Sequence, residues 1–228
     1  MRVLAVDTSS ERGSVCVVDG VEVLGEVRLA SSLQHSERLF RSVEFLFQHI
    51  SFQLADVDLF VAARGPGSFT GLRIGLAAME GFVAAHGKRG SGVTTLEALA
   101  WKTGVRDVLI APTIDARRHE VYGGLYRRRT GHNGIDTLVE EHPPVVLKPA
   151  EWFASLPRQP LIVCGDGAIR YRELMEDKRE WRIHPMDLYL ASTIAEMAAT
   201  LNCGPLAPLY VRKTDAEIAR ESIGSPNS

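Results

Sequence analysis

Residues Arg64 to Gly75 read RGPGSFTGLRIG and directly follow the apolar segment Asp58–Ala63, DLFVAA. Glycines that join a buried strand to a helix are typical of loops that bind nucleotide phosphates. The spacing in this chain fits neither common pattern, because a Walker-type loop or a dinucleotide fingerprint counted from Gly65 needs glycine at position 70, where Thr70 stands. We therefore expect these glycines to shape the backbone and its packing.

The composition is that of an ordinary folded chain. It has 228 residues, of which 45% are hydrophobic and 24% charged, with a formal net charge of −2. No apolar run approaches the roughly 20 residues that a transmembrane helix needs, and the first residues do not have the form of a signal peptide. Three widely spaced cysteines show neither metal-type spacing nor an even disulfide count. These features predict a cytoplasmic protein with no membrane contact.

Strands and helices are expected to follow the same order twice. The first half is predicted to contain strands at 2–7, 14–29 (a hairpin), 58–63 and 91–93, with helices at about 36–50, 70–86 and 95–103. The second half is predicted to contain strands at 107–115, 119–128, 135–147, 160–165 and 181–183, with helices at 149–156, from 168 onward, and at about 187–202. The pattern predicts an α/β fold of two lobes with duplicated βββαβαβα topology.

The boundary between the lobes is expected near residue 103. Residues 1–103 are assigned to the first lobe together with a C-terminal segment at about 204–217, and residues 104–203 to the second lobe. Residues 218–228 are expected to form a flexible tail, since they contain mostly small and polar side chains at their end.

Five segments together resemble the TsaB (YeaZ) family. They are DTSSERGSVCVV at 7–18, HSERL at 35–39, ARGPGSFTGLRIGL at 63–76, IDARRHEVY at 114–122 and PLAPLYVRKTDAE at 205–217. The resemblance covers residues 1 to about 217 and implies an actin-like ATPase (ASKHA) fold. It further implies a scaffold or activating subunit, not catalytic alone, of the bacterial complex that makes threonylcarbamoyladenosine (t6A) in tRNA.

The resemblance also implies the partners of the chain. These are a TsaD homologue in a heterodimer, the ATPase TsaE, and tRNA through the complex; a homodimer of the chain alone is a further expectation. No cofactor of its own is implied, and ATP or ADP is expected only at or near the partner interface. The alternative is a stand-alone ATP-dependent kinase or a metallopeptidase of the actin-like superfamily.

One position of the first long helix argues against metal catalysis. The catalytic relative holds its metal partly through a His-x-x-x-His pair, whereas this chain has His35 followed by Leu39. An open metal site needs about three protein ligands, so the loss of one imidazole weakens the site. We expect neither metal ligands nor catalytic residues.

The two long helices of the first lobe are predicted to carry the partner interface. Gly71, Gly75 and Ala78 recur at spacings of four and three, and small side chains let another helix approach closely. Packing on the chain's own sheet explains this pattern equally well, but the resemblance favours a partner. The predicted interface residues are His35, Leu39, Val43, Leu46, Gly71, Gly75, Ala78 and Phe82.

Two turns are candidates for weak nucleotide binding. The first contains Asp7, Thr8 and Ser9, although Glu11 in the same turn repels an anion. The second contains Gly165 and Gly167, where the backbone has room to approach a ribose or adenine. An ordinary strand-to-helix turn explains these two glycines as well, and is favoured.

Arginines at both ends of one predicted hairpin are candidates for tRNA contact. They are Arg117, Arg118, Arg127 and Arg128, with tyrosines between them. Interleaved arginines and aromatic rings suit RNA. A charged, solvated hairpin edge that resists aggregation is the more common explanation of such a run.

Overall fold

The computed structural model describes residues 1–30, 35–131 and 134–212, without the side chains of His35 and Ser36. The first lobe contains β1 (Arg2–Asp7), β2 (Arg12–Asp19), β3 (Glu22–Ala30), α1 (His35–His49), η1 (Leu54–Asp56), β4 (Leu59–Ala63), α2 (Phe69–His86), β5 (Arg89–Val93) and α3 (Thr95–Lys102). The second contains β6 (Leu109–Asp115), β7 (Val121–Thr130), β8 (Asp136–Leu147), α4 (Pro149–Ser155), β9 (Leu161–Cys164), α5 (Asp166–Arg170), η2 (Arg172–Met175), β10 (Trp181–Ile183) and α6 (Ala191–Thr200).

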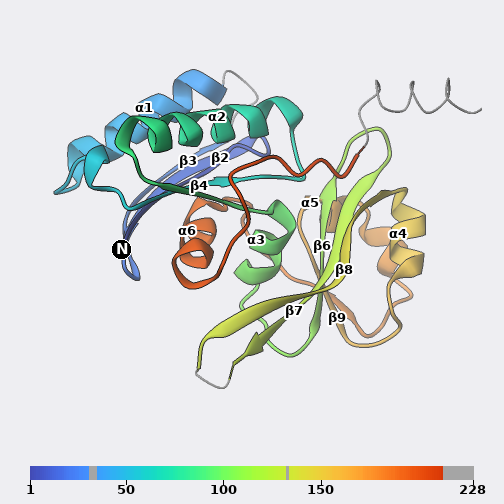
Figure 1. Ribbon diagram of the computed structural model, residues 1–228. Coiled ribbons are helices and arrows are strands. Elements are labelled where there is room, and N and C mark those ends of the chain that lie inside the picture. The colour runs from blue at the N-terminus through green and yellow to red at the C-terminus, as the bar shows by residue number, and fades with distance from the viewer. Residues whose placement is uncertain (31–34, 132–133, 213–228) are drawn as a thin grey trace, which may run out of the picture.

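The two lobes have the same strand order, which confirms the predicted duplication. The first sheet has the order β3-β2-β1-β4-β5, and the second, β10-β9-β6-β7-β8, has the same order when it is read from β8. In each sheet the first three strands are antiparallel, and the strands that follow a helix are parallel to the first one. Figure 1 shows the lobes side by side, each with helices on its sheet.

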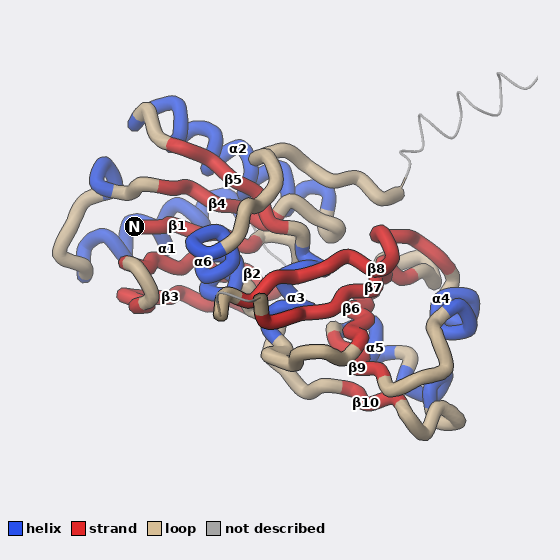
Figure 2. The backbone as a smooth tube through the Cα atoms, turned by 60° about the horizontal axis from the view of Figure 1, so that its bottom comes forward, coloured by secondary structure: helices blue, strands red, loops and turns tan. Residues whose placement is uncertain are grey.

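The last helix of each half packs against the sheet of the other half. Helix α3 contacts β6 and β7, while α6 contacts β1, β2 and β4. The tube in Figure 2 shows α6 beside β1 and β2, and α3 next to β6 and β7. Residues of both helices belong to one apolar core with the inward faces of the two sheets. Because the last helix of each half packs on the sheet of the other half, the two lobes share one apolar core.

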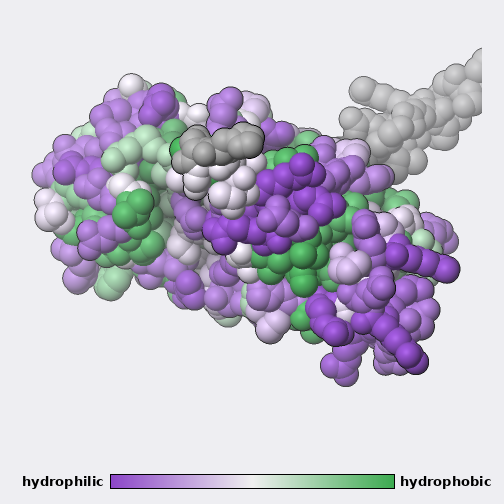
Figure 3. Space-filling model, turned by 90° about the horizontal axis from the view of Figure 1, so that it is seen from below, coloured by the Kyte–Doolittle hydropathy of each residue, from purple (hydrophilic) through white to green (hydrophobic). Residues whose placement is uncertain are grey.

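The outer faces of the two sheets have separate helical covers. Helices α1 and α2 cover the first sheet over a core that includes Leu4, Val6 and Phe60. Helix α4 covers the outer face of the second sheet, where Trp152 and Phe153 are buried. None of the described helices has both the length and the apolar composition of a membrane span. The surface seen from below is largely hydrophilic, with interspersed apolar patches (Figure 3).

The predicted helices at 187–202 and from residue 168 begin elsewhere. Helix α6 starts only at Ala191, because the Asp187 carboxylate accepts hydrogen bonds from the Tyr189 amide (3.0 Å) and Lys102 Nζ (2.5 Å) and holds the preceding residues outside the helix. Helix α5 starts earlier, at Asp166, with Gly165 before it at φ 98°. Glycine suits that position because L side chains rarely adopt such a φ.

Candidate functional site

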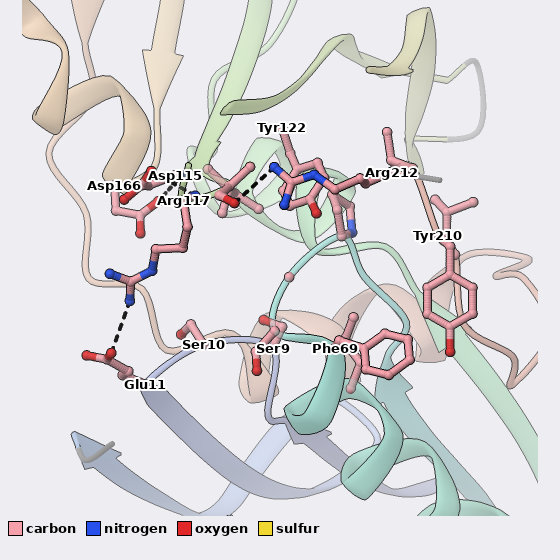
Figure 4. A pocket seen from close by; sticks show the side chains of 18 of the residues that line it. Ser9, Ser10, Glu11, Phe69, Asp115, Arg117, Tyr122, Asp166, Tyr210 and Arg212 are labelled. Carbon is pink, nitrogen blue, oxygen red and sulfur yellow. Dashed lines mark hydrogen bonds and ion pairs between the residues drawn. The ribbon is translucent and has the colours of Figure 1, made fainter. Parts of the chain in front are cut away.

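A cleft of about 750 Å³ lies between the lobes. Its first-lobe wall comes from the turn after β1 and the start of α2, and its second-lobe wall from the turn between β6 and β7 and the start of α5 (Figure 4). Leu209–Arg212, in the segment that follows α6, completes the lining. The lining residues with polar or aromatic side chains are Ser9, Ser10, Glu11, Arg12, Ser68, Phe69, Asp115, Arg117, Arg118, Tyr122, Asp166, Tyr210 and Arg212.

Two bridges cross the cleft from one lobe to the other. Arg117 pairs with Glu11 at 3.0 Å, and both side chains are largely exposed. On the other side, the Leu209 amide donates to the Arg64 carbonyl (2.7 Å), while Arg212 donates to the Ala116 carbonyl (3.1 Å). The C-terminal segment is therefore anchored to the first lobe and tied to the turn of the second, as Figure 4 shows for Arg212.

The second-lobe wall presents two carboxylates. The Asp115 amide donates to Asp166 Oδ1 at 3.1 Å, and the Asp115 carboxylate pairs with Arg170 at 3.1 Å. Burial raises the pKa of the Asp166 carboxyl above its ordinary value. Because carboxylates accept hydrogen bonds and repel anions, this wall suits a ligand with N–H groups and disfavours a phosphate.

The turn between β6 and β7 holds its arginines in a constrained backbone. Arg117, Arg118 and His119 have φ values of 61°, 51° and 58°. Such left-handed conformations are uncommon for residues other than glycine, and several in succession cost free energy. Hydrogen bonds close the turn, from the Ala116 amide to the Glu120 carbonyl (2.9 Å) and from the Glu120 amide to the Arg117 carbonyl (3.0 Å). The turn thus places Arg117 and Arg118 at the cleft.

Only Ser9, of the five candidate nucleotide-binding residues, lines the cleft. Thr8 is buried and its hydroxyl donates to the Gly71 carbonyl at 2.7 Å. Asp7 is fully buried, with Oδ1 accepting from the Ser9 amide (2.9 Å) and Oδ2 without a partner in the described part of the chain. Burial raises the pKa of Asp7 to about 6.

Gly165 and Gly167 approach the chain itself. A Cβ atom on Gly167 would lie 2.9 Å from both the carbonyl oxygen and the methyl carbon of Thr113, and one on Gly165 would overlap the same carbonyl. These glycines let the start of α5 pack against β6. This packing fits the ordinary strand-to-helix turn, and nucleotide binding at Gly165 and Gly167 stays a prediction.

The predicted interface residues of α1 and α2 are mostly buried inside the first lobe. The side chains of Leu39, Val43 and Leu46 belong to the core under α1. Ala78 lies in the same core, and Gly71 and Gly75 face Thr8 so closely that a Cβ atom would overlap it. These six residues are therefore corrected from an exposed surface to internal packing. Phe82 is partly buried against Phe60, with ring centroids 5.6 Å apart, and the side chain of His35 is outside the described part.

Other residues of the same helices are exposed. Phe40 on α1 is 50% exposed, and its ring meets that of Phe82 edge-on at 6.1 Å. Ala77, Gly81 and Ala84 of α2 are exposed, and a Cβ atom on Gly81 would meet nothing within 4 Å. The spacing of four and three at these positions is visible in the sequence. Gly71, Gly75 and Ala78 have the same spacing, so the sequence alone does not show which of the two rows of small residues points outward.

The candidate tRNA-binding arginines separate into two pairs. Arg117 and Arg118 are exposed at the cleft. Arg128 is buried, pairs with Asp136 at 2.7 Å and donates to the Trp101 carbonyl at 2.9 Å. Arg127 pairs with Glu141 at 2.9 Å. Arg128 is therefore corrected from RNA contact to an internal ion pair. The sequence analysis did not identify the cleft residues Arg12, Phe69, Tyr210 and Arg212, because their segments are far apart in the sequence.

The described part of the chain contains no group of three or more His, Cys, Asp or Glu side chains arranged to hold a metal ion. The one position that the resemblance implicates, Leu39, presents an alkyl group that is buried with Val43. The described residues therefore do not fit the His-x-x-x-His metal pair of the catalytic relative.

Comparison with known sequences gives a consistent family. The family model described as TsaD, tRNA N6-adenosine threonylcarbamoyltransferase, matches residues 25–167. A Bacillus subtilis protein named tRNA threonylcarbamoyladenosine biosynthesis protein TsaB is 31% identical over 179 residues, which cover 78% of this chain and 76% of the relative. The protein of the same name from Escherichia coli is 37% identical, over 65% of this chain and 63% of the relative.

Comparison with solved structures agrees with the sequences. YeaZ from Pseudomonas aeruginosa superposes with a TM-score of 0.75 at 26% identity, covering 92% of this chain and 99% of that one. Component A of the (R)-2-hydroxyglutaryl-CoA dehydratase from Acidaminococcus fermentans has a TM-score of 0.51 at 11% identity, covering 87% of this chain and 98% of that one. At 11% identity, the similarity to the dehydratase component shows only that the fold is shared.

Proposed function

Because this chain belongs to the TsaB (YeaZ) family of tRNA threonylcarbamoyladenosine biosynthesis proteins, we propose that it is an activating subunit that pairs with a TsaD homologue and works with TsaE. In this proposal the chain is not catalytic by itself. Its role is to dock on the transferase, and the ATP or ADP that the complex uses lies at or near their interface. A homodimer of the chain alone would use the same surface.

The observation that carries this proposal is the exposed outer face of α1 and α2. The Phe40 side chain is half exposed to solvent. Three small residues of α2, Ala77, Gly81 and Ala84, are exposed next to α1. Small side chains allow the backbone of a second helix to approach, and a large exposed ring supplies apolar area to bury. We define these four residues as the docking face.

The interior of α1 supports the non-catalytic part of the proposal. Leu39 stands in the place of the second histidine of the catalytic relative, and its side chain is buried in the first-lobe core. A metal ligand must reach the ion with a donor atom, which an isobutyl group lacks. The carboxylates at the cleft, Glu11, Asp115 and Asp166, similarly disfavour a triphosphate.

Reconstitution tests the proposal. Purified TsaD, TsaE and unmodified tRNA are combined, together with the substrates of the reaction, with and without this chain, and t6A is measured by mass spectrometry of digested tRNA. We expect product to depend on the chain. Full product in its absence would refute an activating role, and phosphotransfer or peptide cleavage by the chain alone would favour the stand-alone enzyme.

A matched pair of variants locates the interface. Gly81→Arg places a bulky charge on the docking face where the chain itself leaves open space. Ala154→Arg makes the same kind of change at an exposed position of α4. We expect Gly81→Arg to elute as a folded monomer that no longer co-elutes with TsaD, and Ala154→Arg to bind normally. Equal binding by both variants would place the interface elsewhere.

A further inference from the structure

The mouth of the interlobe cleft brings aromatic rings and arginines together from segments far apart in the sequence. Arg12 comes from the start of β2, Phe69 from the start of α2, Arg117 from the turn after β6, and Tyr210 from the C-terminal segment. The volume of about 750 Å³ is in the range of small-molecule sites. The mouth and the inner wall of the cleft favour different chemical groups on a ligand.

One edge of the mouth is an ordered aromatic pair. The rings of Phe69 and Tyr210 lie 5.5 Å apart between centroids at 35°, and both side chains remain more than 40% exposed. Arg73 fixes the pair, because its guanidinium carbon lies 3.9 Å from the Phe69 centroid and its Nε donates to Tyr210 Oη at 3.2 Å. An ordered, exposed ring pair is a platform on which a planar group can stack.

Positive side chains surround the mouth. Arg12 is exposed and has no carboxylate partner among the described residues. The Arg117 pair with Glu11 is exposed on both sides, so it is weakly held and can exchange for a phosphate. Arg212 extends from the C-terminal segment toward the same turn (Figure 4) and pairs there with Glu120, so the positive charge that a ligand can use comes mainly from Arg12 and Arg117. Anionic groups are therefore favoured at the mouth.

The second-lobe wall has the opposite preference. Asp115 and Asp166 line the cleft from neighbouring elements. Asp115 already accepts from Arg170 and from the Arg117 amide, so the acceptor sites left for ligand N–H groups come mainly from Asp166. A ligand that satisfies both regions has phosphates at the mouth and a nitrogen-rich planar ring inside. That combination is a nucleotide whose base enters first.

We propose that this cleft receives an unpaired nucleotide of an RNA strand, with its base toward Asp115 and Asp166, its phosphates at Arg12 and Arg117, and a neighbouring base on Phe69 and Tyr210. The choice of RNA rests on the proposed function in tRNA modification. A strand is favoured over a free nucleotide because the aromatic platform lies at the mouth, where it extends the contact to a second base. A free triphosphate would bring more negative charge toward the acidic wall.

Fluorescence anisotropy with the full-length protein tests this inference. The probe is a fluorescein-labelled 10-nucleotide single-stranded RNA of mixed sequence, with its duplex as a comparison. We expect the single strand to bind more tightly, with affinity that falls as salt rises. Phe69→Ala and Tyr210→Ala should each weaken binding about 5- to 100-fold, the usual range for loss of a stacked base. Tyr210→Phe, which keeps the ring, should retain most of the affinity.

Matched controls separate the cleft from the general surface. Phe45→Ala removes an exposed ring of α1, and Arg158→Ala an exposed arginine beyond α4. Both should bind RNA as the unchanged protein does, whereas Arg12→Ala should lower affinity and reduce the slope of log K against log salt by about 0.7. Thermal melting shows which variants are folded. Equal losses in cleft and control variants, or no loss in any folded cleft variant, would overturn the inference.

Two further measurements distinguish an RNA strand from free ATP, and the cleft assignment from the docking proposal. ATP titrated against the bound RNA should compete only weakly; tight ATP binding without RNA binding would overturn the choice of an RNA strand. The cleft variants should still co-elute with TsaD, while Gly81→Arg should still bind RNA. Loss of RNA binding by folded Gly81→Arg would therefore refute the cleft assignment, and loss of TsaD association by the folded cleft variants would refute the docking proposal, independently of each other.

Discussion

Thr8 and Gly71 are in direct contact between the end of β1 and the first turn of α2. The Thr8 hydroxyl donates a 2.7 Å hydrogen bond to the Gly71 carbonyl, and a Cβ atom on Gly71 would overlap the Thr8 carbonyl oxygen. One turn later, a Cβ atom on Gly75 would overlap the Thr8 hydroxyl. Glycine inside a helix costs about 0.5 to 1 kcal/mol relative to alanine. Here that cost is offset by the close approach of helix and strand.

Gly71→Ala should therefore destabilise the protein, in contrast to alanine at an exposed helical glycine. We expect a loss of about 3 kcal/mol in the free energy of unfolding, because the obstructing atom is backbone and cannot rotate away. Gly81→Ala is the matched control in the same helix, with open space around its Cβ, and should raise stability by about 0.5 to 1 kcal/mol. Urea unfolding measures both. Similar stability changes would mean that α2 can shift away from Thr8.

Arg128→Ala should destabilise the second lobe without affecting RNA binding. Its guanidinium lies 3.7 Å over Trp101 and pairs with the buried Asp136. Without Arg128 the buried Asp136 keeps only Arg106, at 2.8 Å, as its cationic partner, so we expect a loss of about 2 kcal/mol, as for a hydrogen bond to a charged group. The neighbouring Arg129 is exposed and pairs with Glu141 at 3.5 Å; Arg129→Ala should change stability by less than about 0.5 kcal/mol. A weaker RNA complex of a folded Arg128→Ala protein would contradict the internal role.

Glu11→Gln should strengthen RNA binding by the cleft severalfold. The substitution removes a negative charge at the mouth and releases Arg117 from its 3.0 Å ion pair. Because both partners are largely exposed, the loss of the pair itself should change stability by no more than about 1 kcal/mol. Anisotropy titration at two salt concentrations measures the affinity. Unchanged affinity together with an unchanged melting temperature would show that this pair does not limit access to the cleft.

The order of strands and helices is predictable from the sequence because its signals are local. The apolar run at 2–7 and the glycine bend before α2 place β1 and the start of α2 within one residue of their structural positions. The repetition of these signals after residue 107 gives the duplicated topology. Helix α6 departs from its predicted start, since Lys102, far away in the chain, holds Asp187 outside the helix.

The site is less predictable because it depends on which face of each element points inward. Gly75 and Gly81 are both glycines in α2, yet one meets Thr8 and the other meets open space. Arg117 and Arg128 are both hairpin arginines, yet only Arg128 has a buried carboxylate opposite it across β7 and β8. Tyr210 reaches Phe69 only after the chain returns to the first lobe. These choices follow from tertiary packing, and local pattern does not contain them.

Asp7 should make the stability of the protein depend on pH between about 4 and 7. Its carboxyl is fully buried, Oδ2 has no partner among the residues that the structure describes, and burial raises the pKa of Asp7 from 3.8 to about 6. The folded state therefore binds this proton more tightly than the unfolded state does. Its contribution to stability is fully present below pH 3.8 and is lost as pH rises through 6, by about 3 kcal/mol in all.

Asp7→Asn should remove this component, because asparagine keeps an oxygen for the Ser9 amide and carries no titrating proton. The measurement is urea unfolding of both proteins at intervals between pH 4 and 8. We expect the stability of the unchanged protein, relative to the variant, to fall as pH rises to about 7 and then to level off. A fixed offset from the unpaired amide of asparagine does not alter that slope. Asp107→Asn makes the same chemical change at an exposed side chain and controls for the substitution itself. Parallel curves for Asp7→Asn and the unchanged protein would mean that Asp7 binds its proton equally well in the folded and unfolded states.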